Sequence, residues 1–126
     1  MRKSSILLLF LVSFGLKMDQ KVANIEFEEL VYDFGSLDEG EKAFHDFEFS
    51  NTGDAPLIIS DVEVSCGCTT PSFPKEAIAP GEKSSVRIGF NSKGKSGRFD
   101  KSVTVVSNAE DSAVRLRIVG RIIPTH

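Results

Sequence analysis

The sequence contains no tryptophan and only two cysteines, which a single glycine separates. An antibody-type β-sandwich joins its two sheets by a disulfide between cysteines that are far apart in the sequence, and this disulfide packs on a tryptophan. The missing tryptophan and the close spacing of the two cysteines therefore exclude that type. Helical periodicity is also missing, because after Asp19 no stretch longer than a few residues places its apolar side chains on one helical face. The apolar run at residues 6–16 is too short to span a bilayer. The chain after Asp19 is therefore predicted to be nearly all β.

The first residues have the order of a secretory signal peptide. Arg2 and Lys3 form a short basic start, and the apolar run that follows is eleven residues long. No cysteine stands directly after the run, so it does not have the form of a lipoprotein signal. We predict a signal peptide at about residues 1–18 and a single domain at residues 19–126. The exported protein is expected in the periplasm, on the cell surface or in the medium, where disulfides persist.

Basic residues are the minority in the chain that would remain after cleavage. Without Arg2, Lys3 and Lys17, 12 of the 15 basic residues remain against 18 acidic ones, which gives a net charge of −6. Such a charge disfavours binding to nucleic acid or to an anionic membrane surface. We therefore expect a protein or a cell-envelope component as the partner, no nucleic acid, and no membrane span in the cleaved chain.

Several regions alternate apolar and polar residues with a period of two, as half-buried strands do. They cover residues 25–34, 42–50, 57–66, 83–91, 103–105 and 113–123. The alternation slips by one residue near Glu28 and Glu29, which predicts a bulge or a strand that passes from one sheet to another. A bend is predicted at Ser60 and Asp61, within the region that ends at Cys66.

Turn residues separate these regions. Residues 33–40 and 51–54 are predicted turns, and the prolines at positions 71, 74 and 80 predict a long loop and a turn. About seven strands, roughly 8–12 residues apart, are typical of an immunoglobulin-like β-sandwich. The predicted fold class is therefore an all-β, immunoglobulin-like sandwich, with a jelly roll or a small barrel as the structural alternative.

The stretch GFNSKGKS matches the phosphate-loop pattern at Gly89, Gly94, Lys95 and Ser96. In that motif the loop lies between a strand and the N-terminus of a helix, whose backbone N–H groups face the phosphates. Here the residues that follow alternate as a strand instead. We predict a glycine-rich hairpin between two strands, and no nucleotide binding.

Cys66 and Cys68 are not easily explained by packing alone. In an extended strand their Cα atoms would lie about 6.6 Å apart, near the upper limit of about 6.8 Å for a disulfide. A bridge therefore requires the chain to turn, and Gly67 permits a turn. Such a short bridge constrains little of the unfolded chain, which favours a redox-active pair over a stabilising one. A passive bridge or two buried thiols is the alternative without a function.

A metal site is the second functional interpretation of the two thiols. Two thiolates on one face, joined by an imidazole, suit Cu(I) or Zn(II). His45 shares its predicted strand face with Phe47 and Phe49, so its imidazole is expected to point inward. The candidate metal set is Cys66, Cys68 and His45, and the alternative is a core histidine bonded to the backbone. No cofactor is expected otherwise.

Several blocks occur together in an order that resembles a known family. They are YDFG at residues 32–35, EG at 39–40, HDFEFSNTG at 45–53, SCGCT at 65–69, IAPG at 78–81, FNSKGKSG at 90–97 and VVSNA at 105–109. They resemble the bacterial domain-of-unknown-function family 1573, secreted immunoglobulin-like domains akin to those of Hydin and the major sperm protein, over residues 25–123. The resemblance implies the sandwich fold and export, and it implies no activity.

The functional expectation is an exported, non-enzymatic binding or scaffolding module. No catalytic residue is assigned, because the sequence shows no nucleophile–base pair and no carboxylate pair suited to acid–base work. The alternative is a redox-active or Cu/Zn-handling protein that uses the Cys-Gly-Cys pair.

Overall fold

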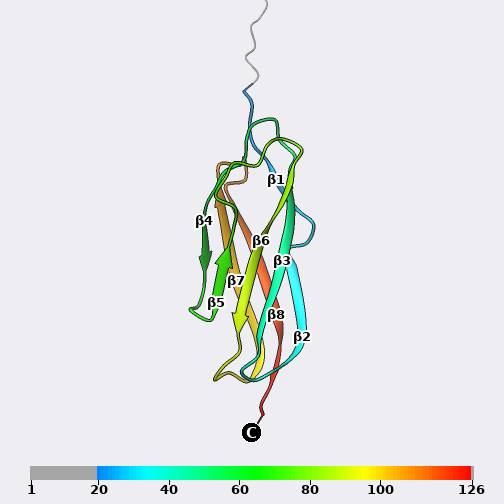
Figure 1. Ribbon diagram of the computed structural model, residues 1–126, viewed down its shortest axis with the longest axis vertical. Helices are drawn as coiled ribbons and strands as arrows, with labels where there is room; N and C mark the ends of the chain where they lie inside the picture. Colours follow the sequence, from blue (N-terminus) through cyan, green and yellow to red (C-terminus); the bar gives the residue numbers. More distant parts are fainter. Residues whose placement is uncertain (1–19, 126) are drawn as a thin grey trace, which may run out of the picture.

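Two four-stranded β-sheets pack face to face along the long axis of the molecule (Figure 1). The computed structural model describes residues 20–125, so the predicted signal peptide at residues 1–18 lies outside the described residues. The strands are β1 (Ile25–Phe27), β2 (Val31–Asp38), β3 (Lys42–Asn51), β4 (Ile59–Val64), β5 (Thr69–Ser72), β6 (Lys83–Asn91), β7 (Gly97–Ser107) and β8 (Ala113–Ile123). One sheet has the order β1-β3-β6-β5, and the other has the order β2-β8-β7-β4. The predicted all-β sandwich is confirmed, and no described residue belongs to a helix that would cross a membrane.

The core lies between the two sheets and is built from the inward residues of the alternating strands. Phe47, Phe49 and Phe90 come from the first sheet and are almost fully buried. Phe99 of the second sheet stacks on Phe90, with ring centroids 4.3 Å apart, and so joins the two layers. Leu116 and the other inward residues of β8 complete the core, as the alternation predicts.

The phase slip near Glu28 and Glu29 marks a strand that changes sheets. β1 pairs with β3 in one sheet, whereas β2 pairs with β8 in the other, and this second pairing is parallel. The prediction of a turn over residues 33–40 was wrong, because β2 continues to Asp38 and the turn is confined to residues 39–40. A bulge between Asp33 and Ser36 absorbs Gly35, whose φ is 75°, so the turn-forming residues remain within the strand.

Two further predictions in the middle of the chain need correction. The bend at Ser60 and Asp61 is confirmed as a register shift in β4, but β4 ends at Val64 and leaves Cys66 in a loop. Strand β5 replaces part of the predicted long loop. It tolerates Pro71 because it lies at the edge of its sheet and hydrogen-bonds only to β6.

The GFNSKGKS stretch connects two strands, as expected, but it is not a hairpin. β6 belongs to the first sheet and β7 to the second, so the connection crosses between the layers. The hydroxyl of the buried Ser92 shares its single donor between the carbonyl oxygens of Asp38 (3.0 Å) and Glu41 (2.7 Å), which lie at the β2–β3 turn. These contacts attach the connection to the β2–β3 turn as it passes across the end of the sandwich.

A buried asparagine organises the opposite end. Asn51, at the end of β3, is 0% exposed, and its side chain bonds to the backbone of three other segments. Position 53 requires glycine, because a Cβ there would lie 2.3 Å from the carbonyl oxygen of Val22. The Asn-Thr-Gly turn is therefore a structural element that fixes the segment before β1.

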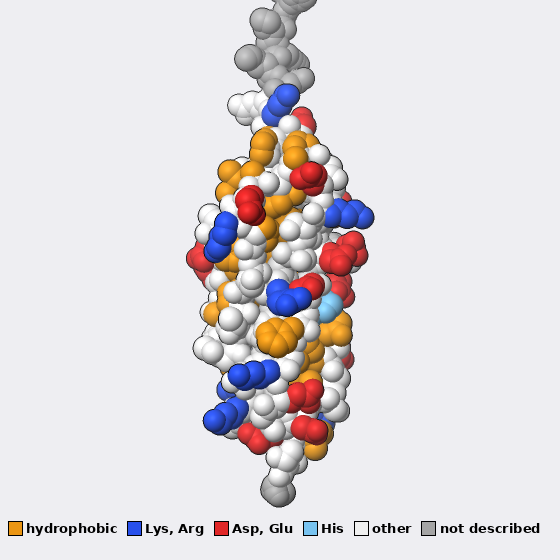
Figure 2. All heavy atoms as spheres, in the orientation of Figure 1, with side chains coloured by type: hydrophobic (Ala, Val, Ile, Leu, Met, Phe, Trp, Pro, Cys, Tyr) orange, Lys and Arg blue, Asp and Glu red, His pale blue; other side chains and the backbone are white. Residues whose placement is uncertain are grey.

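The surface carries mixed charge. On the face shown in Figure 2, basic and acidic side chains are interspersed along the whole length, with hydrophobic side chains between them. Large exposed apolar side chains are few among the described residues, and the most exposed is Phe44 of β3 at 61%. The outer face of the β1-β3-β6-β5 sheet therefore combines one exposed aromatic ring with charged neighbours such as Asp46 and Arg87.

Candidate functional site

The two cysteines lie in the loop between β4 and β5, where the chain passes from the edge of one sheet to the edge of the other (Figure 1). The chain turns at Gly67, and a disulfide joins Cys66 to Cys68 with their Cα atoms 5.3 Å apart. This separation is shorter than the roughly 6.6 Å of an extended strand, as the turn requires. Both cysteines are half-buried. The loop therefore carries a local surface bridge that links no two strands.

Hydrogen bonds hold the cysteine loop on its neighbours. Thr69 donates its N–H to the carbonyl of Cys66 (3.2 Å), and Asn91 of β6 donates its N–H to the carbonyl of Cys68 (2.9 Å). The N–H of Cys68 donates to Sγ of Cys66 (3.2 Å). The hydroxyl oxygen of Thr69 lies 3.8 Å from both sulfur atoms. Two polar donors, the Cys68 N–H and the Thr69 hydroxyl, thus lie beside the sulfur atoms.

His45 lies apart from the cysteines. It belongs to β3, and β6 separates β3 from β5 in the same sheet. Its side chain is only 18% exposed, in agreement with the predicted inward direction. The ring stacks on Tyr32 with centroids 3.5 Å apart, and Nε2 lies 2.6 Å from a carboxylate oxygen of Glu29. His45 is thus held by a side chain, where the alternative interpretation expected a backbone partner.

The candidate metal set of Cys66, Cys68 and His45 is consequently not assembled. Within residues 20–125, no group of three or more histidine, cysteine, aspartate or glutamate side chains is placed to hold a metal ion. The two sulfurs are bonded to each other, and the imidazole is two strands away in the sheet order.

The residues of the phosphate-loop match do not form a phosphate cradle. Gly89 lies within β6, and the connection that holds Gly94, Lys95 and Ser96 leads into β7, with no helix after it. The N–H of Gly94 donates to a carboxylate oxygen of Glu39 at 2.7 Å. A carboxylate therefore already occupies a backbone donor that a bound phosphate would need.

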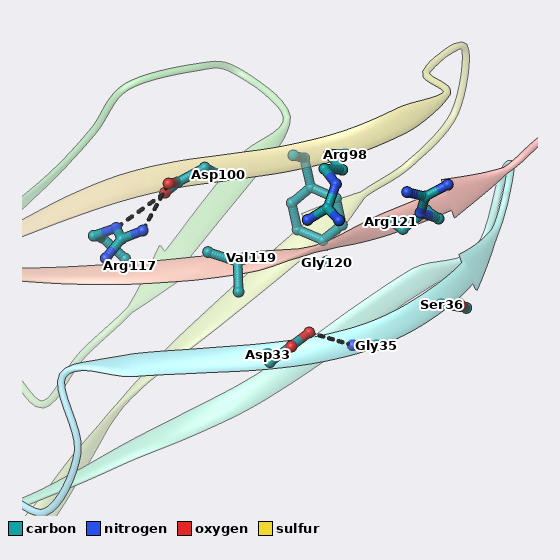
Figure 3. A pocket seen from close by; sticks show the side chains of 10 residues that line it. Asp33, Gly35, Ser36, Arg98, Asp100, Arg117, Val119, Gly120 and Arg121 are labelled. Carbon is teal, nitrogen blue, oxygen red and sulfur yellow. Dashed lines mark hydrogen bonds and ion pairs between the residues drawn. The ribbon is translucent and has the colours of Figure 1, made fainter.

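A hollow of about 580 Å³ lies on the outer face of the β2-β8-β7 sheet (Figure 3). Arg98 of β7 and Arg121 of β8 are direct cross-strand neighbours at one end of it. Towards its other end, Asp100 of β7 and Asp33 of β2 flank Val119 of β8 from either side. The hollow thus places charged side chains from three strands around a floor of small and apolar residues.

The two carboxylates of the hollow already have partners. Arg117 donates to both oxygens of Asp100, at 3.1 and 2.7 Å, and this hydrogen bonding holds the pKa of Asp100 below its usual value. Asp33 accepts the N–H of Gly35 at 2.8 Å. Arg98 and Arg121 are exposed and form no ion pair with another residue of the described chain, residues 20–125. The hollow therefore combines two engaged carboxylates with two guanidinium groups that have no acidic partner there.

Sequence reasoning did not find this hollow. Arg98 and Arg121 are far apart in the sequence, and only the register between β7 and β8 brings them opposite each other. The sequence carries one signal, the polar parity of Arg121 in the alternating region at residues 113–123. That parity predicts an outward side chain but does not identify its neighbour.

The two sheets and their strand order define the chain as an immunoglobulin-like β-sandwich. Within that class, the chain belongs to the family described as "Protein of unknown function (DUF1573)", whose model matches residues 25–122. The resemblance stated from the sequence blocks is thereby confirmed. No curated protein sequence matches the chain.

Solved structures of bacterial and animal proteins share the fold. A protein of unknown function from Porphyromonas gingivalis W83 matches with 20% identity and a TM-score of 0.69, over 79% of this chain and 46% of that one, so this chain spans less than half of that protein. The PapD-like domain 7 of human CEP192 matches with 15% identity and a TM-score of 0.63, over 94% and 99% of the two chains. WR4, an MSP family member of C. elegans, matches with 8% identity and a TM-score of 0.50, over 82% and 100%.

Enzymes also contain a domain of this shape. Two proteases of Vibrio cholerae, a xyloglucanase and a family 123 glycoside hydrolase match this chain over 31% or less of their own lengths. At the identities found, these likenesses show the fold alone.

Proposed function

We propose that this chain is an exported, non-enzymatic binding module that holds an acidic segment of a partner protein in the hollow between β2, β8 and β7. One observation carries the proposal. Arg98 and Arg121 lie directly opposite each other on the adjacent strands β7 and β8, and neither has an acidic partner among residues 20–125. Figure 3 shows both side chains on the same side of the sheet, on neighbouring strands.

The facing arginines are an unfavourable arrangement that an acidic ligand relieves. Like charges directly opposite each other in a sheet are destabilising. A carboxylate between them replaces this repulsion with charge-assisted hydrogen bonds, for which the planar guanidinium fork is well suited. Three arginines and two aspartates line the hollow, so its charged side chains are basic in balance although the chain as a whole has a net charge of −3. The hollow is open to solvent on the outer face of the sheet, which suits a side chain of a partner segment.

The carboxylates of the hollow support binding over catalysis. Asp33 accepts a backbone N–H, and Asp100 accepts hydrogen bonds from Nε and Nη2 of Arg117, so both carboxylates act as structural acceptors. A general base needs a carboxylate positioned to take a proton from a substrate. The enzymes that share the fold carry it as a minor part of their chains, which agrees with an accessory role for such a domain.

The binding proposal is tested by titrating the isotope-labelled chain with a glutamate-rich hexapeptide and following amide resonances. We expect shifts along β7 and β8 near Arg98 and Arg121, and none with the matched glutamine peptide. Arg98→Gln and Arg121→Gln should each weaken binding by about tenfold, the loss expected for one charge-assisted contact of about 1.4 kcal/mol. The control is Arg115→Gln, because Arg115 is exposed on β8 opposite Thr104, away from the hollow. A peptide that shifts none of these resonances, or equal weakening by all three substitutions, contradicts the proposal.

Export is tested separately, because it depends on the N-terminal residues and not on the hollow. When the full chain is produced in a bacterial host, we expect the intact mass of the exported form to lack about the first 18 residues. Retention of the uncleaved chain in the cytoplasm is the contrary result. If the chain is not exported, the peptide titration still tests binding in the hollow, because it uses the purified chain.

A further inference from the structure

The disulfide between Cys66 and Cys68 contributes little to joining the parts of the fold. Only Gly67 lies between the two cysteines, so the closed loop is very short and restricts the unfolded chain little. The flanking strands are held elsewhere, because β4 pairs with β7 and β5 pairs with β6. Stabilisation of the sandwich therefore does not explain why this bridge is present.

The cysteine loop has hydrogen bonds that do not depend on the sulfur–sulfur bond. The Thr69 N–H bonds to the Cys66 carbonyl, and the Asn91 N–H bonds to the Cys68 carbonyl. Thr69 is itself buried and paired with Phe90 in the β5–β6 ladder. When the disulfide opens, these contacts keep both thiols in the same turn. Reduction and reoxidation then require no rearrangement of the strands.

Donors beside the sulfurs favour the charged form that appears during exchange. The Cys68 N–H lies 3.2 Å from Sγ of Cys66, and the Thr69 hydroxyl oxygen lies 3.8 Å from each sulfur. A thiolate is the leaving group when a disulfide is attacked, and hydrogen-bond donors stabilise a thiolate. The half-buried position of both cysteines leaves part of the loop open to an attacking thiol.

We propose that Cys66 and Cys68 form an exchangeable redox pair that accepts two electrons from an external thiol or dithiol. The external thiolate attacks one sulfur, a mixed disulfide forms, the Cys66–Cys68 bond breaks, and the other cysteine leaves as a thiolate that takes up a proton. A second external thiolate then attacks the external sulfur of the mixed disulfide. This step releases the second cysteine and leaves the external thiols oxidised to a disulfide. The inference does not depend on the proposed binding function.

The test uses glutathione as the external thiol. The purified chain is equilibrated in buffers of graded reduced-to-oxidised glutathione, quenched with acid, alkylated and weighed intact. We expect a graded transition from zero to two alkylated cysteines while the far-ultraviolet circular dichroism of the β-sandwich stays unchanged. Cys66→Ser and Cys68→Ser should each accumulate a glutathione adduct, because the second cysteine is missing. A bridge that resists glutathione, or opens only when the circular dichroism signal is lost, overturns the proposal.

A second measurement tests the role of the hydroxyl. Thr69→Val keeps the buried shape but removes the donor near both sulfurs, so it should lower the rate constant for reduction by glutathione by about threefold, as for the loss of one weak hydrogen bond to the leaving thiolate. The matched control is Thr70→Val, because Thr70 is exposed on the same strand and faces away from the loop. Equal constants for Thr69→Val, Thr70→Val and the unchanged chain would overturn the assigned role of Thr69 in exchange.

Discussion

Replacement of Asn51 by alanine tests how the end of the sandwich near the first strand is held together. The Asn51 side chain is fully buried. Its amide oxygen accepts the N–H groups of Asn24 (3.3 Å) and Gly53 (2.9 Å). Its amide nitrogen donates to the carbonyl oxygens of Ala55 (2.8 Å) and Ile78 (2.9 Å). One side chain thus satisfies four backbone groups.

The expected loss follows from the groups that alanine leaves without a partner. The Ile78 carbonyl keeps a second bond from the Leu57 N–H at 2.9 Å. The other three groups have no second bond within the described residues, and each unsatisfied group costs about 1 kcal/mol at the lower end of its range, because this segment is only partly buried. We therefore expect Asn51→Ala to lower the free energy of unfolding by about 3 kcal/mol.

Urea unfolding followed by circular dichroism measures this loss. With a slope of about 1.5 kcal/mol per molar urea, the midpoint should fall by about 2 M. The matched control is Asn108→Ala. Asn108 is exposed, accepts the Ile58 N–H at 2.8 Å and donates to the Pro56 carbonyl at 3.1 Å. Since water replaces exposed bonds, the control should lose less than about 1 kcal/mol, and equal losses in the two variants would refute the reasoning from burial.

Three further predictions concern close contacts and charge. Gly53→Ala places a Cβ 2.3 Å from the Val22 carbonyl oxygen and should lower the melting temperature by about 5 °C or more in calorimetry, whereas Gly67→Ala meets nothing within 4 Å and should change it little. Gly120→Ala places a Cβ 2.7 Å from the Phe99 ring and should lower the free energy of unfolding in urea by about 1–3 kcal/mol; an unchanged midpoint would contradict the contact. Hydrogen bonds from Arg87 and Arg117 hold the pKa values of Asp46 and Asp100 below the ordinary 3.8, so their stabilisation is present above pH 3.8 and is lost as the pH falls through the lowered folded-state values. Melting temperatures between about pH 5 and 2 should therefore fall less steeply in the Asp46→Asn, Asp100→Asn double variant, and an identical slope would remove this explanation.

Much of the fold can be predicted from the sequence, because a strand that buries only one face alternates apolar and polar residues with a period of two. Phe47 and Phe49 of β3 and Ile88 and Phe90 of β6 alternate with polar residues, and these strands lie where the alternation predicts them. β5 was missed because Pro71 is a poor strand residue in general, and only its position at a sheet edge makes it acceptable.

The candidate sites were less predictable because they depend on which strands become neighbours. Cys66 and Cys68 are two residues apart, so the sequence alone indicates that a disulfide between them requires a turn. His45 was a candidate partner on its strand parity alone, but it lies on β3, and β6 separates β3 from β5, the strand that follows the cysteine loop. The Arg98 and Arg121 pair is set by the register between the consecutive strands β7 and β8, which the alternation within either strand does not specify.

The parallel pairing of β2 with β8 has a consequence for when this domain can fold. Among residues 20–125, β2 is the second strand in chain order and β8 comes after all the others, yet the two are direct neighbours in one sheet. A contact between strands so distant in the chain requires closure of a loop that contains most of the domain, and such contacts form slowly. The domain therefore cannot complete its second sheet until the final strand has left the ribosome. Before then β2 has no neighbour in its sheet, because β8 is the only strand with which it pairs among residues 20–125.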